Sequence, residues 1–415
     1  MPKGEARHEV LRRVRGAARG FGNRLPPSSA GHVPVTVTVC LSPGTVGYPQ
    51  GTGHFWAYLN WALSLQAVGC RVVWLEDVGG LLGSRPAAQA AQDVATLVAR
   101  LERWGLGSAL ALTDFRGCPV DAVLARDGLD LDDAATASDL LLDFTYEAPR
   151  SVVSSFRRSA LVDLDPGLLQ IGMSRGDLRV ERHDAYFTIG ETVGTADARF
   201  PDGGVRWEYT PPPVFLGAWD PVDPKPGGAY TTVTNWWGEW ILVDGETVDN
   251  EKRTAFMALL DLPARVPVTL ELALTPDEHT METDARLLEQ RGWKVRDAWE
   301  VCGTPEDYRD YIRRSRAELS AAKPSCRLLA NAWVSDRTIC YLASGKPAVV
   351  EHTGCSRILP DAEGLLRFRD IDEAAAAIAA VEAEPEKHGR WARELAEAHF
   401  DGEHVVRGVL EHALP

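Results

Sequence analysis

The chain has 415 residues, of which 45% are hydrophobic and 25% are charged. This length favours two or three domains over one, and a composition close to the globular average excludes a largely disordered, collagen-like or coiled-coil chain. The 59 acidic residues outnumber the 44 basic ones, and the formal net charge of -15 argues against broad binding to nucleic acids or anionic membranes.

Residues 1–30 have the opposite charge balance, with seven lysines and arginines against two glutamates, and are predicted to be a disordered basic tail. They lack the apolar core of a secretory signal, and no later stretch approaches the roughly 18 apolar residues of a membrane helix. We therefore expect a cytoplasmic protein with no integral membrane segment. The seven cysteines are odd in number and widely spaced, which favours buried free thiols over disulfides or a metal site.

Residues 31–205 are predicted to form the first of two Rossmann-like lobes. Val33–Cys40 has the β-branched density of a buried strand, a glycine-containing loop follows at Gly44–Gly53, and Phe55–Val68 is predicted to be a helix leading to the strand Arg71–Leu75. Such a βαβ unit calls for a parallel sheet. Further elements are a helix at Ala88–Trp104 and strands at Leu140–Phe144, Ser159–Asp163 and Tyr186–Gly190.

Residues 206–229 are rich in proline and glycine and are predicted to be a linker. The second lobe, residues 230–385, again alternates strands and helices, and residues 386–415 are predicted to be C-terminal helices that could pack back on the first lobe. Its strands are expected at Tyr230–Asn235, Pro267–Leu274, Trp293–Val301, Ala317–Ala322 and Pro347–Val350, and its helices near Asn250–Leu260, Asp277–Arg291, Pro305–Arg314 and Ser335–Ser344. The predicted fold is α/β, with two Rossmann-like lobes whose mostly parallel sheets face a cleft.

The first candidate site is the loop Gly51-Thr52-Gly53-His54, between the first strand and its helix. Glycines allow close backbone approach, and a helix N-terminus favours an anion. Trp56 replaces the third glycine of the dinucleotide fingerprint, which argues against a nicotinamide dehydrogenase. His54 is a candidate general base near neutral pH, and the alternative is that it caps its helix.

The most informative run is Ser335–Gly354. It reads as a helix ended by Gly345, a buried strand, and the polar loop Glu351–Gly354 at the carboxyl end of that strand. This sequence resembles the nucleotide-sugar-binding half of GT-B glycosyltransferases of the group 1 type, whose helix ends in A-x-G-x-P before a "VV" strand and a polar loop with glycine. The downstream run Glu363–Glu373 fits the same pattern, and the likeness covers about residues 230–400.

The resemblance implies a transferase that moves a sugar from a nucleotide diphosphate sugar to a hydroxyl-bearing acceptor, either a small natural product or a glycan. It implies no further cofactor and no catalytic metal. One departure is clear, because Cys340 stands at the first position of the usual glutamate pair and the loop after Gly354 has no acid. Retention and inversion therefore both stay open, and Asp336 and Glu351 are the candidate replacements.

The donor site is expected within residues 230–375. Lys323 directly follows a predicted strand, and Lys252 begins a helix where similar enzymes often place a phosphate-binding lysine; an ammonium group suits a diphosphate leaving group, although either lysine could instead be a solvated surface charge. Three tryptophans within Asn235–Trp240 could stack on a sugar or base, or could be buried. The full set of donor-site candidates is Asn235, Trp236, Lys252, Lys323, Ser335, Arg337, Thr338, His352, Thr353 and Gly354.

On the acceptor side the candidates are Gly51, Thr52 and Gly53 together with Asp163 and Asp165, which follow a predicted strand; the alternative for the two aspartates is a simple Asp-Pro turn. Two other functions are compatible with two such lobes. A sugar-nucleotide epimerase would place several acids and histidines around the anomeric centre, and these are sparse here. A non-catalytic two-lobed binding protein would not need a lysine at a diphosphate site.

Overall fold

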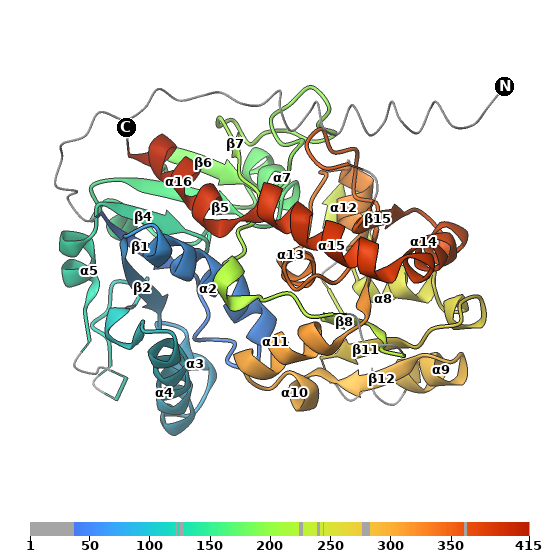
Figure 1. Cartoon of the computed structure of the whole chain (residues 1–415). Coiled ribbons are helices and arrows are strands. Elements are labelled where there is room, and N and C mark those ends of the chain that lie inside the picture. Colours follow the sequence, from blue (N-terminus) through green and yellow to red (C-terminus); the bar gives the residue numbers. More distant parts are fainter. Residues whose placement is uncertain are drawn as a thin grey trace, which may run out of the picture. The chain divides into compact units, whose positions relative to one another are not determined.

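The computed structural model describes residues 37–121, 123–124, 128–223, 227–238, 241–243, 245–275, 283–360 and 363–414. The predicted basic tail lies outside the described residues, as do residues 224–226 of the predicted linker, Trp240 and residues 276–282. The described chain forms two parallel sheets, of seven and six strands, with helices around them (Figure 1). The predicted α/β class with two Rossmann-like sheets is thereby confirmed.

The first sheet has the strand order β3-β2-β1-β4-β5-β6-β7, and all of its pairings are parallel. β1 and β4 are buried at every residue, as expected at the centre of a parallel sheet covered on both faces. The last strand lies within the residues predicted as linker, so the first sheet extends to Tyr209. The strands are β1 (Thr38–Ser42), β2 (Arg71–Asp77), β3 (Leu110–Thr113), β4 (Leu140–Asp143), β5 (Ser159–Asp163), β6 (Ala185–Thr188) and β7 (Glu208–Tyr209).

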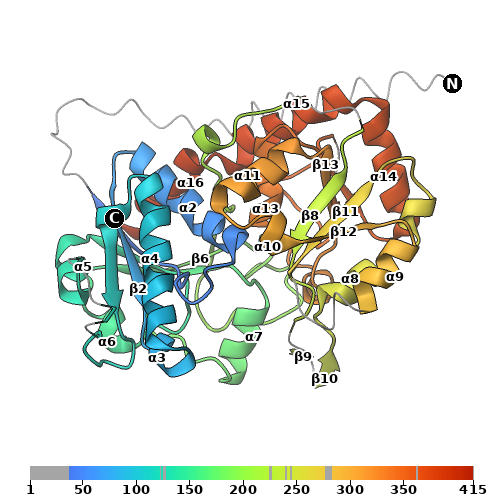
Figure 2. The same cartoon turned by 90° about the horizontal axis from the view of Figure 1, so that it is seen from below.

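The second sheet has the order β12-β11-β8-β13-β14-β15, again all parallel. A separate antiparallel hairpin, β9 (Ile241–Val243) and β10 (Glu246–Val248), follows β8 along the chain (Figure 2). The strands of the sheet are β8 (Tyr230–Thr234), β11 (Leu270–Leu274), β12 (Lys294–Asp297), β13 (Ala317–Ser320), β14 (Ala348–Glu351) and β15 (Leu365–Phe368). In each sheet the first strand along the chain lies in the interior of the sheet, between two later strands: β1 between β2 and β4, and β8 between β11 and β13. Ligands of such sheets bind beyond the carboxyl ends of the strands, next to this first strand.

One predicted strand, Trp293–Val301, is too long. β12 ends at Asp297, whose carboxylate accepts hydrogen bonds from the backbone N–H groups of Trp299 (2.7 Å) and Glu300 (3.4 Å). This N-cap satisfies amide groups that have no partner at a helix start, so the chain turns into the helix α10 (Ala298–Val301). The correction matters for function, because it places Trp299 beyond the carboxyl end of a strand.

The helices of the first lobe precede or follow its strands in regular alternation, and those of the second lobe do the same. They are α2 (Thr52–Ala67), α3 (Leu81–Ser84), α4 (Ala87–Arg103), α5 (Leu131–Ala137), α6 (Arg150–Val153), α7 (Leu168–Arg175), α8 (Lys252–Met257), α9 (Ala285–Gln290), α11 (Pro305–Arg314), α12 (Pro324–Leu329), α13 (Asp336–Ala343), α14 (Ile371–Ala383), α15 (Pro385–Leu395) and α16 (Gly402–Ala413). None of the described helices is long and apolar enough to cross a bilayer.

The C-terminal helices connect the two lobes. α15 packs on α13 in the second lobe and continues through a π-helical segment, Ala396–Phe400, into α16. α16 then packs on α2 and β6 of the first lobe (Figures 1 and 2). The chain therefore crosses between the lobes twice, once after β7 and once at the end of α15.

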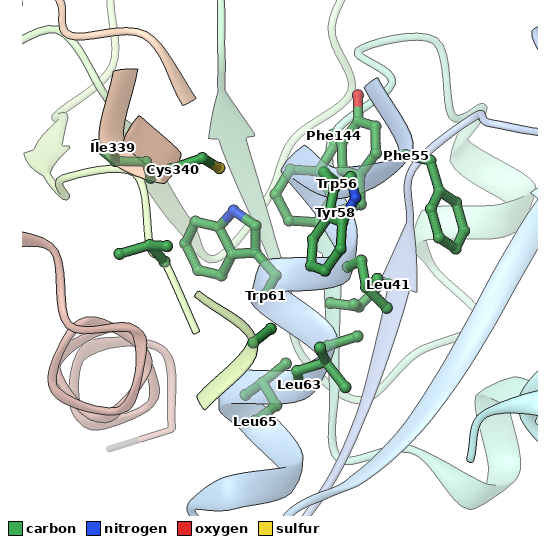
Figure 3. Packing of buried hydrophobic residues seen from close by; sticks show 14 of the residues in the cluster. Leu41, Phe55, Trp56, Tyr58, Trp61, Leu63, Leu65, Phe144, Ile339 and Cys340 are labelled. Carbon is green, nitrogen blue, oxygen red and sulfur yellow. The ribbon is translucent and has the colours of Figure 1, made fainter. Parts of the chain in front are cut away.

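α2 is the structural centre of this arrangement. Eleven of its 16 residues are buried, on all sides of the helix, because it lies between its own sheet and the helices α11 and α13 of the second lobe. Trp61 extends from α2 toward Cys340 on α13 (Figure 3). Trp56 donates to the Pro305 carbonyl at 2.7 Å, so the packing is reinforced by a buried hydrogen bond between the lobes.

Asn60 is the buried polar residue of α2. Its side-chain oxygen accepts hydrogen bonds from the Phe215 N–H (3.1 Å) and the Trp219 indole (3.2 Å), and its nitrogen contacts the Cys340 sulfur at 3.8 Å. It therefore ties the segment that leaves the first lobe to the interface between the lobes.

We predict that Asn60→Leu lowers the free energy of unfolding by about 2 to 4 kcal/mol, since it leaves two buried N–H donors unsatisfied at roughly 1 to 3 kcal/mol each. Urea unfolding followed by tryptophan fluorescence measures the change. Gln66→Leu, a half-buried amide on the same helix, should change the free energy of unfolding by less than about 1 kcal/mol. Equal effects of the two substitutions would contradict the assignment.

Candidate active site

A cavity of about 440 Å³ lies between the lobes, where loops beyond the carboxyl ends of β1, β5, β8, β12 and β13 converge. Eleven of the residues selected from the sequence line it. They are Gly51, Thr52, Gly53, His54, Asp165, Asn235, Lys252, Lys323, Ser335, Asp336 and Arg337.

His54 enters the cavity from the first turn of α2. It is half-buried, and its ring packs edge-on against Tyr58 with centroids 4.9 Å apart. Burial lowers its pKa below the usual value, while Asp336 of the second lobe, the Gly44 carbonyl and Asp165 favour the protonated form. Gly51 is the N-cap residue of α2 and no side chain caps this helix, so His54 has no capping role. A mainly neutral imidazole thus faces a carboxylate from the opposite lobe.

The glycines of the preceding loop are required by side-chain packing. A Cβ atom on Gly51 would lie 2.2 Å from the Tyr48 ring, and one on Gly53 would lie 3.0 Å from Tyr308 of α11. Thr52 donates from its hydroxyl to the Cys302 carbonyl at 2.8 Å. The loop is therefore a close contact between the lobes at one end of the cavity.

Three cations of the second lobe gather in the cavity. Lys252 begins α8 and is half-buried; burial, together with the positive charges of Arg337 and Lys323, lowers its pKa to about 7. Lys323 precedes α12 and donates across the cleft to Asp165 at 3.3 Å, and this carboxylate raises the pKa of Lys323. Cations that repel one another in this way form a site for an anion.

Arg337 is held rigidly beside these lysines. Its guanidinium donates to Glu318 at 2.8 Å, to the Val233 carbonyl at 2.9 Å and to the Ser320 hydroxyl. Ser335 caps the helix α13 by accepting from the Arg337 N–H at 3.2 Å. The arginine therefore contributes a fixed charge beside the two lysines.

The two acceptor-side aspartates have different roles. Asp163 is fully buried and accepts hydrogen bonds from Gln170 (2.7 Å), the Thr188 hydroxyl (2.7 Å) and the Asp165 N–H (2.9 Å). Burial raises its pKa to about 6. Asp163 does not line the cavity; it positions Asp165, whose half-exposed side chain does.

The loop Glu351–Gly354 also lies outside the cavity. Glu351 accepts from the Ala322 N–H at 3.0 Å, and the Thr353 hydroxyl donates to the Trp333 carbonyl at 2.7 Å. Gly354 has a φ of +132°, and a Cβ there would lie 2.5 Å from the Ala330 carbonyl. His352 is bonded into the same turn, where its ring nitrogen accepts from the Gly354 N–H at 3.2 Å. The loop thus supports residues 322–333, which do reach the cavity.

Two further candidates are buried beside the cavity. Trp236 is 1% exposed, stacks on Phe256 and donates to Asp284 at 2.8 Å. Thr338 is 2% exposed within α13. Of the two alternatives for Trp236, stacking on a ligand or burial, the structure shows burial.

Trp237, one of the tryptophans expected to stack on a sugar or base, lines the cavity and is 38% exposed. Three other aromatic residues of the cavity were missed by sequence reasoning: Trp299, which is 45% exposed, and Tyr58 and Tyr308, which line it from opposite lobes. The sequence predicts Trp299 to lie inside the strand Trp293–Val301, which is too long; in the structure Trp299 lies in α10, after β12 has ended. The signal that could have found it is the aspartate at position 297, a preferred N-cap residue.

The segment next to α13 is strained. Ala330 and Ala332 have φ values of +50° and +54°, which residues other than glycine seldom adopt, and Asn331 between them donates to the Pro166 carbonyl of the first lobe at 2.7 Å. Such strain is concentrated at ligand sites, and here it joins the two sides of the cavity.

All seven cysteines lie within the described residues and are free thiols, four of them buried. Cys340, at the position of the usual glutamate, is among the buried ones, and burial raises its pKa far above the usual range. The described residues contain no group of three or more His, Cys, Asp or Glu side chains that could hold a metal ion.

Comparison with known proteins agrees with this geometry. Residues 285–414 match a family model described as glycosyl transferase-like. Among solved structures, HepE from Anabaena in complex with UDP-glucose is 12% identical with a TM-score of 0.55, covering 90% of this chain and 98% of HepE. An α-glucosyltransferase in complex with UDP and a 13-mer DNA is 9% identical with a TM-score of 0.57, covering 92% and 100%. AviGT4, a glycosyltransferase of avilamycin A biosynthesis, is 13% identical with a TM-score of 0.50, covering 91% and 97%.

No curated protein matches the chain in sequence. Sequence identities this low to the solved structures establish only the shared fold. The match of residues 285–414 to the glycosyl transferase-like family model adds the class of enzyme. The protein is a glycosyltransferase with the GT-B fold, as predicted. Neither comparison supports the epimerase or the non-catalytic binding protein.

The low pKa of Lys252 gives a prediction about stability. An unfolded chain keeps lysine near 10.5, so between pH 7 and that value the unfolded state binds one more proton than the folded state, and stability rises with pH. We expect Lys252→Met to lose this rise, so that the wild type gains stability relative to the variant between pH 7 and 9 in urea unfolding. The control Lys387→Met, at a surface lysine that is 38% exposed and paired with Glu384, should show no such change. A pH-independent difference for Lys252→Met would refute the assignment.

Proposed function

We propose that the protein transfers a sugar from a nucleoside diphosphate sugar to a hydroxyl-bearing acceptor, a small natural product or a glycan, in the cavity between the lobes. The observation that carries this proposal is the group of cations Lys252, Lys323 and Arg337 at one cavity of a chain with a net charge of -15. HepE and the α-glucosyltransferase are solved in complex with UDP, which makes UDP the first nucleotide to test.

The second lobe holds the donor. Lys252 and Lys323 bind the diphosphate, with the fixed charge of Arg337 behind them, and they stabilise the negative charge that develops as the bond between the sugar and the phosphate breaks. Trp237 and Trp299 present partly exposed rings at the same cavity, suited to stacking on the base or on an apolar sugar face.

The first lobe activates the acceptor. The acceptor oxygen forms a bond to the anomeric carbon, the diphosphate leaves with the electron pair of the broken bond, and the hydroxyl proton passes to His54. Asp336, which faces His54, stabilises the resulting imidazolium. Glu351, the other candidate replacement for the glutamate pair, lies outside the cavity, so Asp336 is the carboxylate retained in this scheme.

The acceptor is proposed not to be nucleic acid. The α-glucosyltransferase is solved with DNA, but the acidic balance of this chain opposes that class of acceptor. A thermal-shift panel of nucleoside diphosphates tests the donor site directly, because a ligand at 100 times its dissociation constant stabilises the fold by about 2.7 kcal/mol. Release of nucleoside diphosphate with a glycosylated product would establish transfer, and an unchanged donor with no stabilisation would refute the proposal.

Lys323 gives a paired prediction. Lys323→Ala should weaken UDP binding by about 10- to 150-fold, the effect of losing a charge-assisted contact of roughly 1.5 to 3 kcal/mol. Asp165→Asn should instead tighten UDP binding by about two- to fivefold, because Asp165 competes with the diphosphate for the same ammonium and an exposed ion pair contributes up to about 1 kcal/mol. Titration calorimetry measures both. Unchanged affinity in Lys323→Ala would assign this lysine to the solvated surface.

His54→Ala should lower turnover by about 100- to 10,000-fold, the usual contribution of a positioned base, while UDP affinity stays near wild type. Single-turnover sugar transfer from bound donor separates the two quantities. His404→Ala, an exposed histidine on α16, is the matched control and should leave both unchanged. A loss of UDP affinity with unaffected single-turnover chemistry would make His54 a binding residue.

A further inference from the structure

A second cavity, of about 1110 Å³, lies on the first lobe away from the cleft. We call it the β6 groove. It is formed by the loop 176–184 with the start of β6, by the turn 203–206, and by His412 of α16. Because it lies at the amino end of β6 and the cleft lies beyond the carboxyl end of the same strand, the two sites are separate.

The floor of the β6 groove is apolar. Met173, Val180, Tyr186 and Val205 line it, and Leu178, which is 39% exposed, extends the apolar surface at its edge. Tyr186 is in turn supported by Trp207, with ring centroids 5.6 Å apart. A hollow of this size with a supported apolar floor can hold the apolar body of a ligand.

The rim of the groove carries cations in excess of its acids. Among the described residues Arg206 pairs with Glu208 at 2.9 Å, and Asp184 accepts from the Ser159 N–H at 2.9 Å. Arg179 and Arg182 are exposed and have no hydrogen bond or ion pair to any described residue. Two unpaired guanidinium groups in a chain with 15 excess negative charges are a suitable partner for a phosphate or carboxylate.

His183 adds a polar group at the same place. It is 4% exposed, and its Nε2 lies 3.6 Å from the Asp143 carboxylate, while its Nδ1 has no hydrogen-bond partner within the described part of the chain. Burial lowers its pKa to about 4, so the ring is neutral near pH 7. A buried polar atom without a partner is uncommon in folded proteins.

The helix α7 connects the groove to the cleft. Leu168 at its start lines the cleft, and Met173 near its end lines the groove. Its eight residues span about 12 Å at 1.5 Å per residue. The two sites therefore lie at the two ends of one short helix.

We propose that the β6 groove binds an organic anion with an apolar body, a phosphate or carboxylate attached to an alkyl or aryl group, and that this anion is the non-reacting end of the acceptor. The ligand class follows from the groove alone, whereas its role as part of the acceptor rests on the proposed function.

Titration of the full chain with octyl phosphate tests the ligand class. We expect saturable binding of octyl phosphate, with octyl glucoside and inorganic phosphate each at least about tenfold weaker, since each lacks one half of the ligand. The double variant Arg179→Gln/Arg182→Gln should lose about tenfold or more in affinity. Arg71→Gln/Arg199→Gln, which removes two exposed arginines elsewhere on the first lobe, is the control for net charge and should bind as wild type.

Equal losses in the two double variants, or equal binding of octyl phosphate and octyl glucoside, would overturn the proposal. UDP affinity measured on the same variants should be unchanged, which shows that they are folded and that the donor site is intact. A wild-type protein that binds octyl phosphate but not UDP would refute the proposed function and leave the groove assigned.

Discussion

The burial of α2 between the lobes is the constraint on which the rest of the structure depends. Trp56 and Asn60 of this helix are hydrogen-bonded to groups of the second lobe and of the segment that leaves the first, so the carboxyl edges of the two sheets are held close together. The N-terminus of the same helix then brings His54 to the cavity, opposite Asp336. Packing at one end of α2 thereby determines the chemistry available at the other.

Charge is divided between the lobes in a way that suits transfer from an anionic leaving group. The second lobe supplies the cations, and the first supplies the neutral histidine and the half-exposed carboxylate Asp165. The ion pair of Asp165 with Lys323 joins the two sides of the cavity. Because that pair is half-exposed, it contributes little to stability.

The sequence predicted the sheets more reliably than the site. Buried parallel strands are nearly continuous apolar runs, and strands such as β4, β5 and β13 fall where the runs occur. Their ends were harder to predict, because a side-chain cap such as Asp297 ends β12 inside a run that keeps its apolar character. Eleven candidate residues line the cavity because ligands of parallel sheets bind beyond the carboxyl ends of the strands. This rule does not tell which of two neighbouring residues lines the cavity and which is buried, as with Asp165 and Asp163 or with Trp237 and Trp236.

By itself the sequence determined the fold class and the positions from which polar side chains could enter the cleft, because periodicity and spacing are local properties of the chain. The class of enzyme was implied by the resemblance of residues 230–400 to GT-B glycosyltransferases. Only the tertiary structure decided which of these side chains line the cavity and which are bonded to other groups of the protein. Glu351 accepts a hydrogen bond from the backbone N–H of Ala322, which is distant in sequence, and Asp163 accepts one from the nearby N–H of Asp165. The pKa of Lys252 is lowered by burial and by cations more than 70 residues away along the chain. Burial and long-range charge arise only when the chain is folded, so no local pattern encodes them.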